Sequence, residues 1–592
     1  WSQSVWILEI LLWILFLPND SMERFENSRF AFYCCFRTSD PVSGIFYFTG
    51  NFGPIKYKTL REDRTATVWK TEEDIMFQIE HLTFQYALAE EKTLKDLSFE
   101  IKEGTITLLI GPSGSGKSTL LRHLKKELMP RGKRQGDVYY RGRRLQEWDS
   151  KTTVSEIGYL FQDPSKQMVM DTVWHEIAFG MENLGIPYRK MRRTVAELVN
   201  YFNLQKLYRM PCAQLSGGEK QMVNLASLAA MRPRVLILDE PTAQLDPVGR
   251  RNFLSMLEKL HREFQMTIII AAHDLEDLME KADQCIFMEH GCIREIGTPE
   301  QVIQKIWEKR NDFRDLFPEM IRLSEKFCEK PEFSMSVIRE AMKKMSYETI
   351  LPKKENEYGA PVICIQHLYA GYGKDKILMD LSMDVRMKEF FTVLGANGSG
   401  KTTLMRCMTG RLRYTGKIRM KRRFAYLPQD PTVFFVKDRL LDDLCESSTG
   451  KEKHLDELVD LCDLREQLDQ HPYDLSGGQQ QMAALIKVLL REPEILLLDE
   501  PTKGMDRSHK LRLGKLLRGL CDGGMAILCV THDMEFAAAF SDRVGMLFDG
   551  KLEAVDRPVR FFTDSYFYTT TTAKITRGME KPAILPENVR RI

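Results

Sequence analysis

Two stretches decide the fold: Gly111-Pro-Ser-Gly-Ser-Gly-Lys-Ser-Thr119 and Gly395-Ala-Asn-Gly-Ser-Gly-Lys-Thr-Thr403. Each lies between a short apolar run that predicts a strand and a segment that predicts a helix. These flanking segments are Thr105–Ile110 and Ser118–Lys126 in the first copy, and Phe390–Leu394 and Thr402–Met408 in the second. Glycines let backbone N–H groups close around phosphate oxygens at a helix N-terminus. The sequence therefore predicts two phosphate-binding loops.

Further elements repeat in the same order in both halves of the chain. They are Leu215-Ser-Gly-Gly218 and Leu475-Ser-Gly-Gly478, Val235-Leu-Ile-Leu-Asp-Glu-Pro-Thr242 and Ile495-Leu-Leu-Leu-Asp-Glu-Pro-Thr502, and Ala272-His-Asp274 and Thr531-His-Asp533. Such a repeat predicts one structural unit used twice. The apolar runs at Val235–Leu238, Thr267–Ala271, Ile495–Leu498 and Ala526–Val530 are typical of buried parallel strands, so we predict the α/β fold class.

The loop residues point to binding of ATP with Mg²⁺. The expected nucleotide-binding residues of the two loops are Gly111, Gly114, Gly116, Lys117, Ser118 and Thr119, and Gly395, Gly398, Gly400, Lys401, Thr402 and Thr403. The lysines are placed to reach the β- and γ-phosphates, and the hydroxyls of Ser118 and Thr402 to bind Mg²⁺.

A pair of carboxylates follows a buried strand in each half. Asp239 and Asp499 end the strands, where a carboxylate is placed to hold the Mg²⁺ shell. The next residue, Glu240 or Glu500, is placed to polarise the attacking water. A single Asp-Glu at a strand end is more often only solvated, but its position after a phosphate-binding loop favours the catalytic interpretation.

The two Leu-Ser-Gly-Gly tetrapeptides separate this chain from other phosphate-loop proteins. A Ser-Gly-Gly at a helix start is an anion cradle, a helix N-cap, or both. With these motifs, most of residues 77–302 and 362–550 resembles the ATP-binding cassette family. The resemblance implies two cassette ATPase domains in tandem, each with a small antiparallel β subdomain and a helical subdomain.

The family's remaining site positions are carried over from the resemblance. It implies that Gln162 and Gln429 are Q-loop glutamines that sense Mg²⁺ and water, and that His273 and His532 are switch histidines that contact the γ-phosphate. It implies that Asp246 and Asp506 are D-loop aspartates that cross between domains, and that Tyr86 and Tyr372 stack on adenine. The signature residues that close over ATP are Ser216, Gly217, Gly218, Ser476, Gly477 and Gly478. The alternative for each tyrosine is packing on the core at a strand end. Since both sets are intact, we expect two competent sites.

Composition limits the other classes of function. The formal net charge is +2, which gives no argument for nucleic acid, and the twelve cysteines form no C-x-x-C motif, so a reduced, cytoplasmic setting is expected. Val5–Leu17 is apolar except for Glu9, but it is shorter than the about 20 residues that span a bilayer. A short helix that contacts the membrane is the alternative for this segment.

We predict five segments. They are an N-terminal segment 1–72 that is non-catalytic or not native to the protein, a first cassette domain 73–302, a helical and charged linker 303–360, a second cassette domain 361–568, and a C-terminal tail 569–592.

Two classes of cassette protein are compared. Residues 301–360 hold 12 Lys and Arg against 11 Asp and Glu, so there is no basic arm of the kind that ribosome-associated tandem cassettes carry. The sequence instead resembles the tandem ATPases of energy-coupling factor transporters, which import vitamins, vitamin precursors or metal ions. The resemblance rests on Phe161-Gln-Asp-Pro-Ser-Lys-Gln167, Thr172-Val-Trp-His-Glu-Ile-Ala-Phe-Gly180 and the tail Phe561–Thr570.

The resemblance also implies partners and a location. We expect a transmembrane coupling subunit and a substrate-binding membrane subunit at the cytoplasmic face of the cell membrane, with the two cassettes of one chain pairing with each other. The segments Val169–Phe179 and Val436–Leu444 mix apolar with acidic residues, including Glu176, Asp442 and Asp443, and predict the surface for a coupling helix. The alternatives are the ATPase of a sugar importer, or a cassette ATPase acting on ribosomes.

Overall fold

The computed structural model describes residues 44–45, 58–59, 75–87, 89, 91–243, 245–272, 278–309, 313, 317–350, 358–373, 375–420, 422–447 and 452–592. The chain divides into two units, Trp1–Thr71 and Glu72–Ile592, which are taken separately. In the first unit, strand β1 (Gly44–Ile45) pairs antiparallel with β2 (Lys58–Thr59). The apolar segment 5–17 and His273 lie outside the described residues.

The first cassette is built on a six-stranded sheet in the order β12-β11-β5-β10-β9-β8. Its strands are β5 (Ile106–Ile110), β8 (Ile157–Leu160), β9 (Val235–Asp239), β10 (Thr267–Ala271), β11 (Gln284–Glu289) and β12 (Cys292–Gly297). Strands β8, β9, β10, β5 and β11 run parallel and only the edge strand β12 is antiparallel. Every residue of β5, β8, β9 and β10 is buried, as continuous apolar runs in parallel sheets require.

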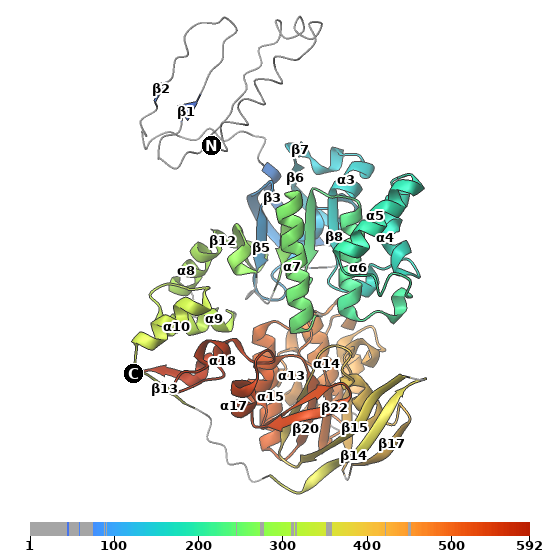
Figure 1. Cartoon of the computed structure of the whole chain (residues 1–592), viewed down its shortest axis with the longest axis vertical. Helices are drawn as coiled ribbons and strands as arrows, with labels where there is room; N and C mark the ends of the chain where they lie inside the picture. The colour runs from blue at the N-terminus through green and yellow to red at the C-terminus, as the bar shows by residue number, and fades with distance from the viewer. Residues whose placement is uncertain are drawn as a thin grey trace, which may run out of the picture. The chain divides into compact units, whose positions relative to one another are not determined.

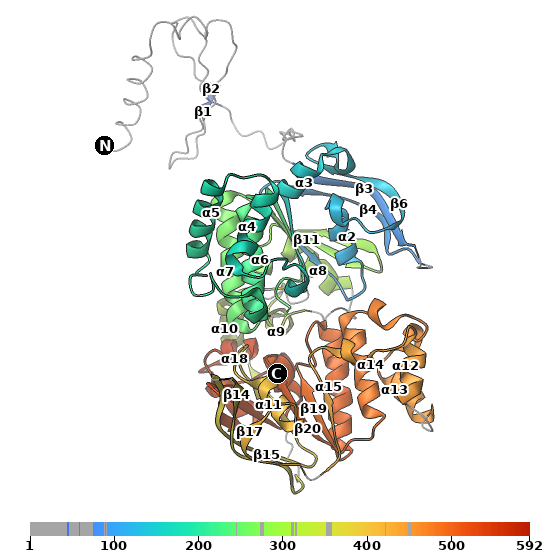
Figure 2. The same cartoon turned by 90° about the vertical axis from the view of Figure 1, so that its right-hand side faces the viewer.

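An antiparallel sheet and a helical region complete this cassette. The antiparallel strands are β3 (Ile75–Tyr86), β4 (Leu94–Lys102), β6 (Gly132–Tyr140) and β7 (Arg143–Arg144). The helices are α2 (Lys117–His123), α3 (Ser150–Glu156), α4 (Val173–Asn183), α5 (Tyr188–Tyr201), α6 (Gly217–Ala230), α7 (Pro247–Phe264) and α8 (Pro299–Lys309). Figure 2 shows β3, β4 and β6 on the opposite side of the cassette from α4, α5 and α6.

The second cassette repeats this plan. Its parallel sheet has the order β18-β19-β20-β16-β21-β22 and its antiparallel sheet the order β15-β14-β17. The strands are β14 (Pro361–Tyr372), β15 (Asp375–Arg386), β16 (Phe390–Leu394), β17 (Tyr414–Met420), β18 (Phe424–Leu427), β19 (Ile495–Asp499), β20 (Ala526–Thr531), β21 (Arg543–Phe548) and β22 (Lys551–Asp556). The helices are α11 (Lys401–Met408), α12 (Leu440–Ser447), α13 (Glu452–Leu461), α14 (Gly477–Leu489), α15 (Arg507–Asp522), α16 (Met534–Phe540) and α17 (Pro558–Asp564).

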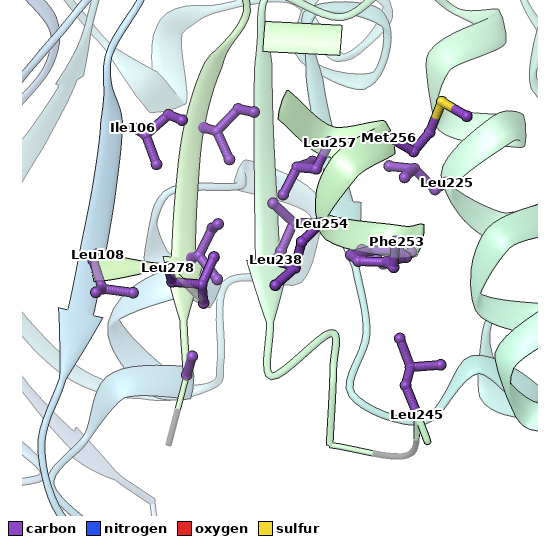
Figure 3. Close-up of a cluster of buried hydrophobic side chains, with 14 of the residues drawn as sticks. Ile106, Leu108, Leu225, Leu238, Leu245, Phe253, Leu254, Met256, Leu257 and Leu278 are labelled. Carbon is purple, nitrogen blue, oxygen red and sulfur yellow. The ribbon is translucent and has the colours of Figure 1, made fainter. Parts of the chain in front are cut away.

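The core lies between each parallel sheet and its helices. In the first cassette, Leu254 and Leu257 of α7 lie beside Leu238 of β9 (Figure 3), and Phe253 and Leu108 belong to the same core cluster. All five side chains are buried. Because α7 begins directly after Asp246, this packing fixes the position of that carboxylate.

The predicted strands and P-loop helices are present with small shifts in their ends. The helix predicted over Ser118–Lys126 ends at His123, and a 3₁₀ turn begins at Lys126. Lys125 between them has an extended backbone, and its ammonium donates to the carbonyls of Thr153 (3.2 Å) and Ile157 (2.6 Å).

The segments predicted as linker and tail pack against each other. Helices α9 (Glu319–Phe327) and α10 (Met335–Lys344) contact α18 (Thr571–Thr576), and β13 (Tyr347–Thr349) pairs antiparallel with β23 (Val589–Arg591), as Figure 1 shows around α10 and α18. α8 spans the boundary predicted at 302/303. The two segments therefore form one body that is continuous with the core of the first cassette. Within the described residues, no helix has the length and apolar character needed to span a bilayer.

Candidate active site

Each P-loop closes around its own lysine. The Lys117 ammonium donates to the carbonyls of Gly111 and Pro112 at 2.9 Å each, and Lys401 holds the equivalent carbonyls of its loop at 2.8 and 3.1 Å. Gly111 is required there, since a Cβ atom would lie 2.1 Å from the Met288 carbonyl oxygen. Burial lowers the pKa of Lys117, and nearby Glu240, Asp506 and Asp239 act against this.

One buried hydroxyl in each loop is consistent with a phosphate site. The Oγ atoms of Ser115 and Ser399 are buried, and neither has a hydrogen-bond partner among the described residues. A phosphate oxygen is a suitable acceptor for such a hydroxyl.

A hydroxyl and a carboxylate meet beneath each P-loop. Ser118 Oγ donates to Asp239 Oδ1 at 2.8 Å, and Thr402 Oγ1 donates to Asp499 Oδ1 at 3.2 Å. Oxygen ligands of this kind fit Mg²⁺, which usually keeps water and phosphate for its other positions. The described residues contain no group of three or more His, Cys, Asp or Glu that would hold a metal without phosphate. Burial raises the pKa of Asp499 to about 6, with Glu500 adding to the effect.

The glutamates that follow these aspartates have left-handed backbones, with φ of 47° at Glu240 and 51° at Glu500. This conformation is uncommon for residues other than glycine and recurs at functional sites. Gln162 Nε2 donates to Glu240 Oε2 at 2.6 Å, so the glutamine and the glutamate predicted for one site are in contact. Gln429 is exposed at the corresponding position.

In the second cassette the glutamate is surrounded by donors. Glu500 Oε2 lies 2.8 Å from His532 Nδ1 and accepts from Thr531 Oγ1 at 3.1 Å, while Lys401 Nζ lies 3.3 Å from Oε1. Burial by itself would raise the pKa of Glu500, but His532, Lys401 and Thr531 outweigh it and lower the pKa to about 2. Glu500 is therefore ionised near neutral pH.

The D-loop aspartates join the two cassettes. Ser113 N donates to Asp506 Oδ2 at 3.0 Å, and Asn397 N donates to Asp246 Oδ2 at 2.9 Å. The other oxygen of each aspartate caps its own helix, so one carboxylate holds both a helix start and the opposite P-loop. The His509 N–H and ring keep the pKa of Asp506 well below its usual range, although burial acts to raise it.

The signature serines start helices α6 and α14. Each caps its helix in a reciprocal capping box, with Glu219 as the partner of Ser216 and Gln479 as the partner of Ser476. The N-cap interpretation is therefore present in the structure. Within the described parts of the chain, no hydrogen bond joins either serine to a P-loop.

The two tyrosines expected at adenine lie beside the P-loop helices. Tyr86 OH is 3.1 Å from Thr119 Oγ1, and Arg406 donates to Tyr372 OH at 2.9 Å with its guanidinium 5.9 Å from the ring centre. Both hydroxyls thus have protein partners.

Two acidic residues predicted for a partner surface are instead buried. Glu176 Oε2 accepts from the N–H groups of Val169 (3.0 Å) and Met170 (2.7 Å), and Asp443 pairs with Lys487 at 2.9 Å. Glu176 and Asp443 therefore cannot contribute their carboxylates to the predicted surface for a coupling helix, because both hold the loop after the Q-loop.

Sequence reasoning missed two tyrosines. Tyr159 OH donates to Asp239 Oδ2 at 3.1 Å, and Tyr426 OH donates to Asp499 Oδ2 at 3.2 Å. Burial and the adjacent carboxylate raise the pKa of both tyrosines, so the hydroxyls keep their protons. The available signal was the repeated spacing of Tyr-Leu-x-Gln, which ends at Gln162 and Gln429.

Comparison with known proteins agrees with this arrangement. The family model described as ABC transporter matches residues 94–243 and 378–503, which contain the P-loop, the signature and the Asp-Glu pair of each cassette. A relative from Bacillus cereus (strain ATCC 10987 / NRS 248), named as an ABC transporter ATP-binding protein, is 38% identical over 542 residues, covering 86% of this chain and 97% of its own. The chain belongs to the ABC transporter family. It is an ATPase, and the predicted fold of two α/β cassettes in tandem is confirmed.

Two further proteins are similar to this ABC transporter ATPase, one in sequence and one in fold. A Bacillus subtilis (strain 168) protein named as the HMP/thiamine import ATP-binding protein YkoD is 30% identical over 517 residues, covering 83% of this chain and 93% of its own. The archaeal ribosome recycling factor aABCE1, solved with the stalk protein aP1, gives a TM-score of 0.51 at 22% identity over 80% of this chain and 87% of its own. That second likeness shows the fold alone.

Proposed function

We propose that this ABC transporter ATPase hydrolyses MgATP at two sites shared between its cassettes and so powers import through separate membrane subunits. The observation that carries the proposal is the reciprocal contact of each D-loop with the opposite P-loop, Asp506 with Ser113 and Asp246 with Asn397. In this arrangement Lys117 shares one ATP with Ser476, and Lys401 shares the other with Ser216.

The chain's own residues suit this chemistry. Lys117 and Lys401 exchange their loop carbonyls for phosphate oxygens, and the helix N-termini that follow add N–H donors. Ser118 with Asp239, and Thr402 with Asp499, supply oxygen ligands on the side away from solvent. When bound, Mg²⁺ neutralises phosphate charge.

The glutamates are proposed as the groups that polarise water. Glu500 is ionised and is oriented by His532, and Glu240 is oriented by Gln162. A carboxylate held in this way can accept a proton from an attacking water. Closure of the opposite signature over the nucleotide then excludes solvent.

A pairing experiment tests the shared sites. We expect Lys117→Ala with Ser476→Arg to damage one site and leave about half of the ATPase activity, whereas Lys117→Ala with Ser216→Arg damages both sites. If the second pair is the one that spares a site, each cassette forms its own site and the shared arrangement is wrong.

An exposed apolar surface supports docking on membrane subunits. Val169, Val433 and Val436 are 65%, 68% and 80% exposed in the loops after the two Q-loops. The buried carboxylates of Glu176 and Asp443 accept N–H groups of these same loops, at 3.0 Å from Val169 and 3.4 Å from Val436. In both cassettes this hydrogen bond holds a loop that exposes apolar side chains beside the proposed nucleotide-sensing glutamine.

We propose an energy-coupling factor transporter as the specific system, located at the cytoplasmic face of the membrane. Its partners are a transmembrane coupling subunit and a substrate-binding membrane subunit. The substrate class is a vitamin, a vitamin precursor or a metal ion, and the name of the Bacillus subtilis relative favours the vitamin precursor. The ATPase of a sugar importer is the second candidate. It is less favoured because both sets of site residues are intact here.

Purification of the tagged full chain from membranes tests the partners. We expect a multi-spanning subunit and a small membrane protein to copurify. Val169→Asp with Val436→Asp should release the chain from membranes, whereas Phe548→Asp, which changes a residue that is 62% exposed at the end of β21, should not. Sedimentation with ribosomes in place of membranes contradicts the proposal.

A further inference from the structure

We propose that Tyr159 and Tyr426 are positioning residues for the Mg²⁺-binding carboxylates of the two sites. Each tyrosine hydroxyl donates to the one oxygen of the aspartate that the P-loop hydroxyl does not use. The inference rests on the proposed roles of Asp239 and Asp499 in holding Mg²⁺.

The geometry is the same in both cassettes. Asp239 Oδ1 accepts from Ser118 at 2.8 Å and Oδ2 from Tyr159 at 3.1 Å. Asp499 Oδ1 accepts from Thr402 at 3.2 Å and Oδ2 from Tyr426 at 3.2 Å. The same pair of donors, one P-loop hydroxyl and one tyrosine hydroxyl, is therefore present on the equivalent carboxylate of both cassettes.

The tyrosines reach the carboxylates because of the sheet order. β8 lies beside β9 with Tyr159 opposite Ile237, and β18 lies beside β19 with Tyr426 opposite Leu497. Each aspartate therefore ends a strand whose neighbour carries a tyrosine two residues back in register. Parallel pairing places the hydroxyl at the carboxyl end of the sheet, where the phosphate loop also lies.

The rings have little freedom to move. Tyr159 is 3% exposed and its ring centre is 5.0 Å from that of Phe161, while the Arg411 guanidinium lies 5.5 Å from the ring centre of Tyr426. A fixed ring fixes its hydroxyl, so each tyrosine is a rigid donor for a buried carboxylate.

Two donors on opposite oxygens define the plane of the carboxylate. A hydroxyl that gives its proton to Asp239 keeps lone pairs, so Ser118 can bind a cation while it still orients the aspartate. With Tyr159 on the other oxygen, rotation of the carboxylate costs a hydrogen bond. Partners of this kind behind metal ligands usually contribute about 10- to 100-fold to metal affinity.

The same strand end also serves the catalytic glutamate in the first cassette. Gln162 lies three residues after Tyr159 and donates to Glu240 at 2.6 Å. Gln167 ties the two positions together, accepting from Phe161 N at 3.0 Å and donating to the Tyr159 carbonyl at 3.1 Å. One short segment therefore orients both neighbouring carboxylates.

Nucleotide binding measured with and without Mg²⁺ tests the proposal. In the full chain carrying Tyr159→Phe and Tyr426→Phe, the Kd of a fluorescent, non-hydrolysable ATP analogue is measured in excess Mg²⁺ and in EDTA. We expect the gain in affinity that Mg²⁺ provides to fall about 10-fold, with the Kd in EDTA unchanged.

Tyr140→Phe is the matched control. Tyr140 is fully buried and its hydroxyl donates to Glu156 at 2.8 Å, in the antiparallel sheet of the first cassette. This change removes the same kind of hydrogen bond and should leave the Mg²⁺ gain unaltered. Thermal unfolding of all variants gives the stability cost separately.

The double variant Asp239→Asn with Asp499→Asn distinguishes the positioning role of the tyrosines from the Mg²⁺ site itself. If these changes remove the Mg²⁺ gain and the tyrosine changes leave it intact, the positioning role is wrong while the Mg²⁺ site stands. If the aspartate changes also leave the Mg²⁺ gain intact, the proposed Mg²⁺ site itself is wrong. An equal loss of affinity in EDTA and in Mg²⁺ for the tyrosine variant also overturns the positioning role.

Discussion

Replacement of the D-loop aspartate by serine separates its two tasks. Asp506 caps α15 through Oδ1, which accepts from His509 N at 2.9 Å, and holds Ser113 N of the opposite P-loop through Oδ2 at 3.0 Å. Serine is as good an N-cap as aspartate, but it has one oxygen and cannot hold both donors. Asp506→Ser should therefore keep the helix start and lose the contact between cassettes.

The expected fall in kcat/KM follows from the loss of the hydrogen bond between Ser113 N and Asp506. A hydrogen bond to a charged group contributes about 1.5–3 kcal/mol, and we take the lower end because water can replace the carboxylate at Ser113 N. About 1.4 kcal/mol corresponds to a tenfold change, so kcat/KM for ATP should fall about tenfold in Asp506→Ser. Asp506→Ala also loses the cap, which costs about 1 kcal/mol of stability.

Steady-state ATPase and thermal unfolding of the purified full chain measure the two effects. Asp149→Ser is the control, because Asp149 caps helix α3 through Thr152 N at 2.9 Å and has no hydrogen bond to the second cassette among the described residues. It should leave kcat/KM unchanged. An Asp506→Ser protein with wild-type kcat/KM refutes the role of the cross-cassette bond, and one as unstable as Asp506→Ala refutes the separation of tasks.

Three further changes have defined outcomes. Glu240→Gln with Glu500→Gln should retain ATP binding, measured by equilibrium titration, and lower kcat by about 100-fold or more; near-normal kcat would remove these residues from the proton-accepting role. Burial lowers the pKa of His123 to about 4, so the folded state resists protonation and stability falls as the pH drops from about 6.5 to about 4. His123→Gln should remove about 3 kcal/mol of that pH dependence in urea unfolding, and an unchanged slope would contradict this. Arg322→Met removes a buried guanidinium that pairs with two partly exposed carboxylates and should cost about 2 kcal/mol in the same assay, against less than about 0.5 kcal/mol for the exposed Arg560→Met; equal costs would contradict this.

The central sheets could be predicted closely because the signal was local. The strands β9, β10, β16, β19 and β20 are apolar apart from single threonines and the aspartates that end β9 and β19, and every residue in them is buried. Only parallel strands between two layers of helices take such runs without alternation. The P-loops could be predicted equally well, since the spacing of their glycines indicates where the backbone must adopt a positive φ.

The motif residues of the candidate site could be named from the sequence, but only part of their contacts could. Asp239 and Ser118 are recognisable because each lies in a known motif. Tyr159 is marked only by the repeated Tyr-Leu-x-Gln spacing, and its contact with Asp239 follows from the order of β8 and β9 in the sheet. Glu176 was misplaced for a related reason. A carboxylate near a surface loop is normally exposed, and nothing local shows that two backbone N–H groups converge on it.

The body formed by linker and tail could not be predicted from local patterns, because its partners lie more than 200 residues apart. Glu319 shows why. Its position at the start of a charged helix suggests exposure, yet it is 6% exposed, burial raises its pKa, and Thr572 donates to it from both N and Oγ1 at 2.9 Å. The hydroxyl-rich run Thr569–Thr572 suggests a solvated tail, yet each of its side chains is buried. Each segment has polar groups that only the other can satisfy, so neither has a stable buried position until both are present. Prediction of this body requires knowledge of which linker residues contact which tail residues, and no local stretch of either segment contains that information.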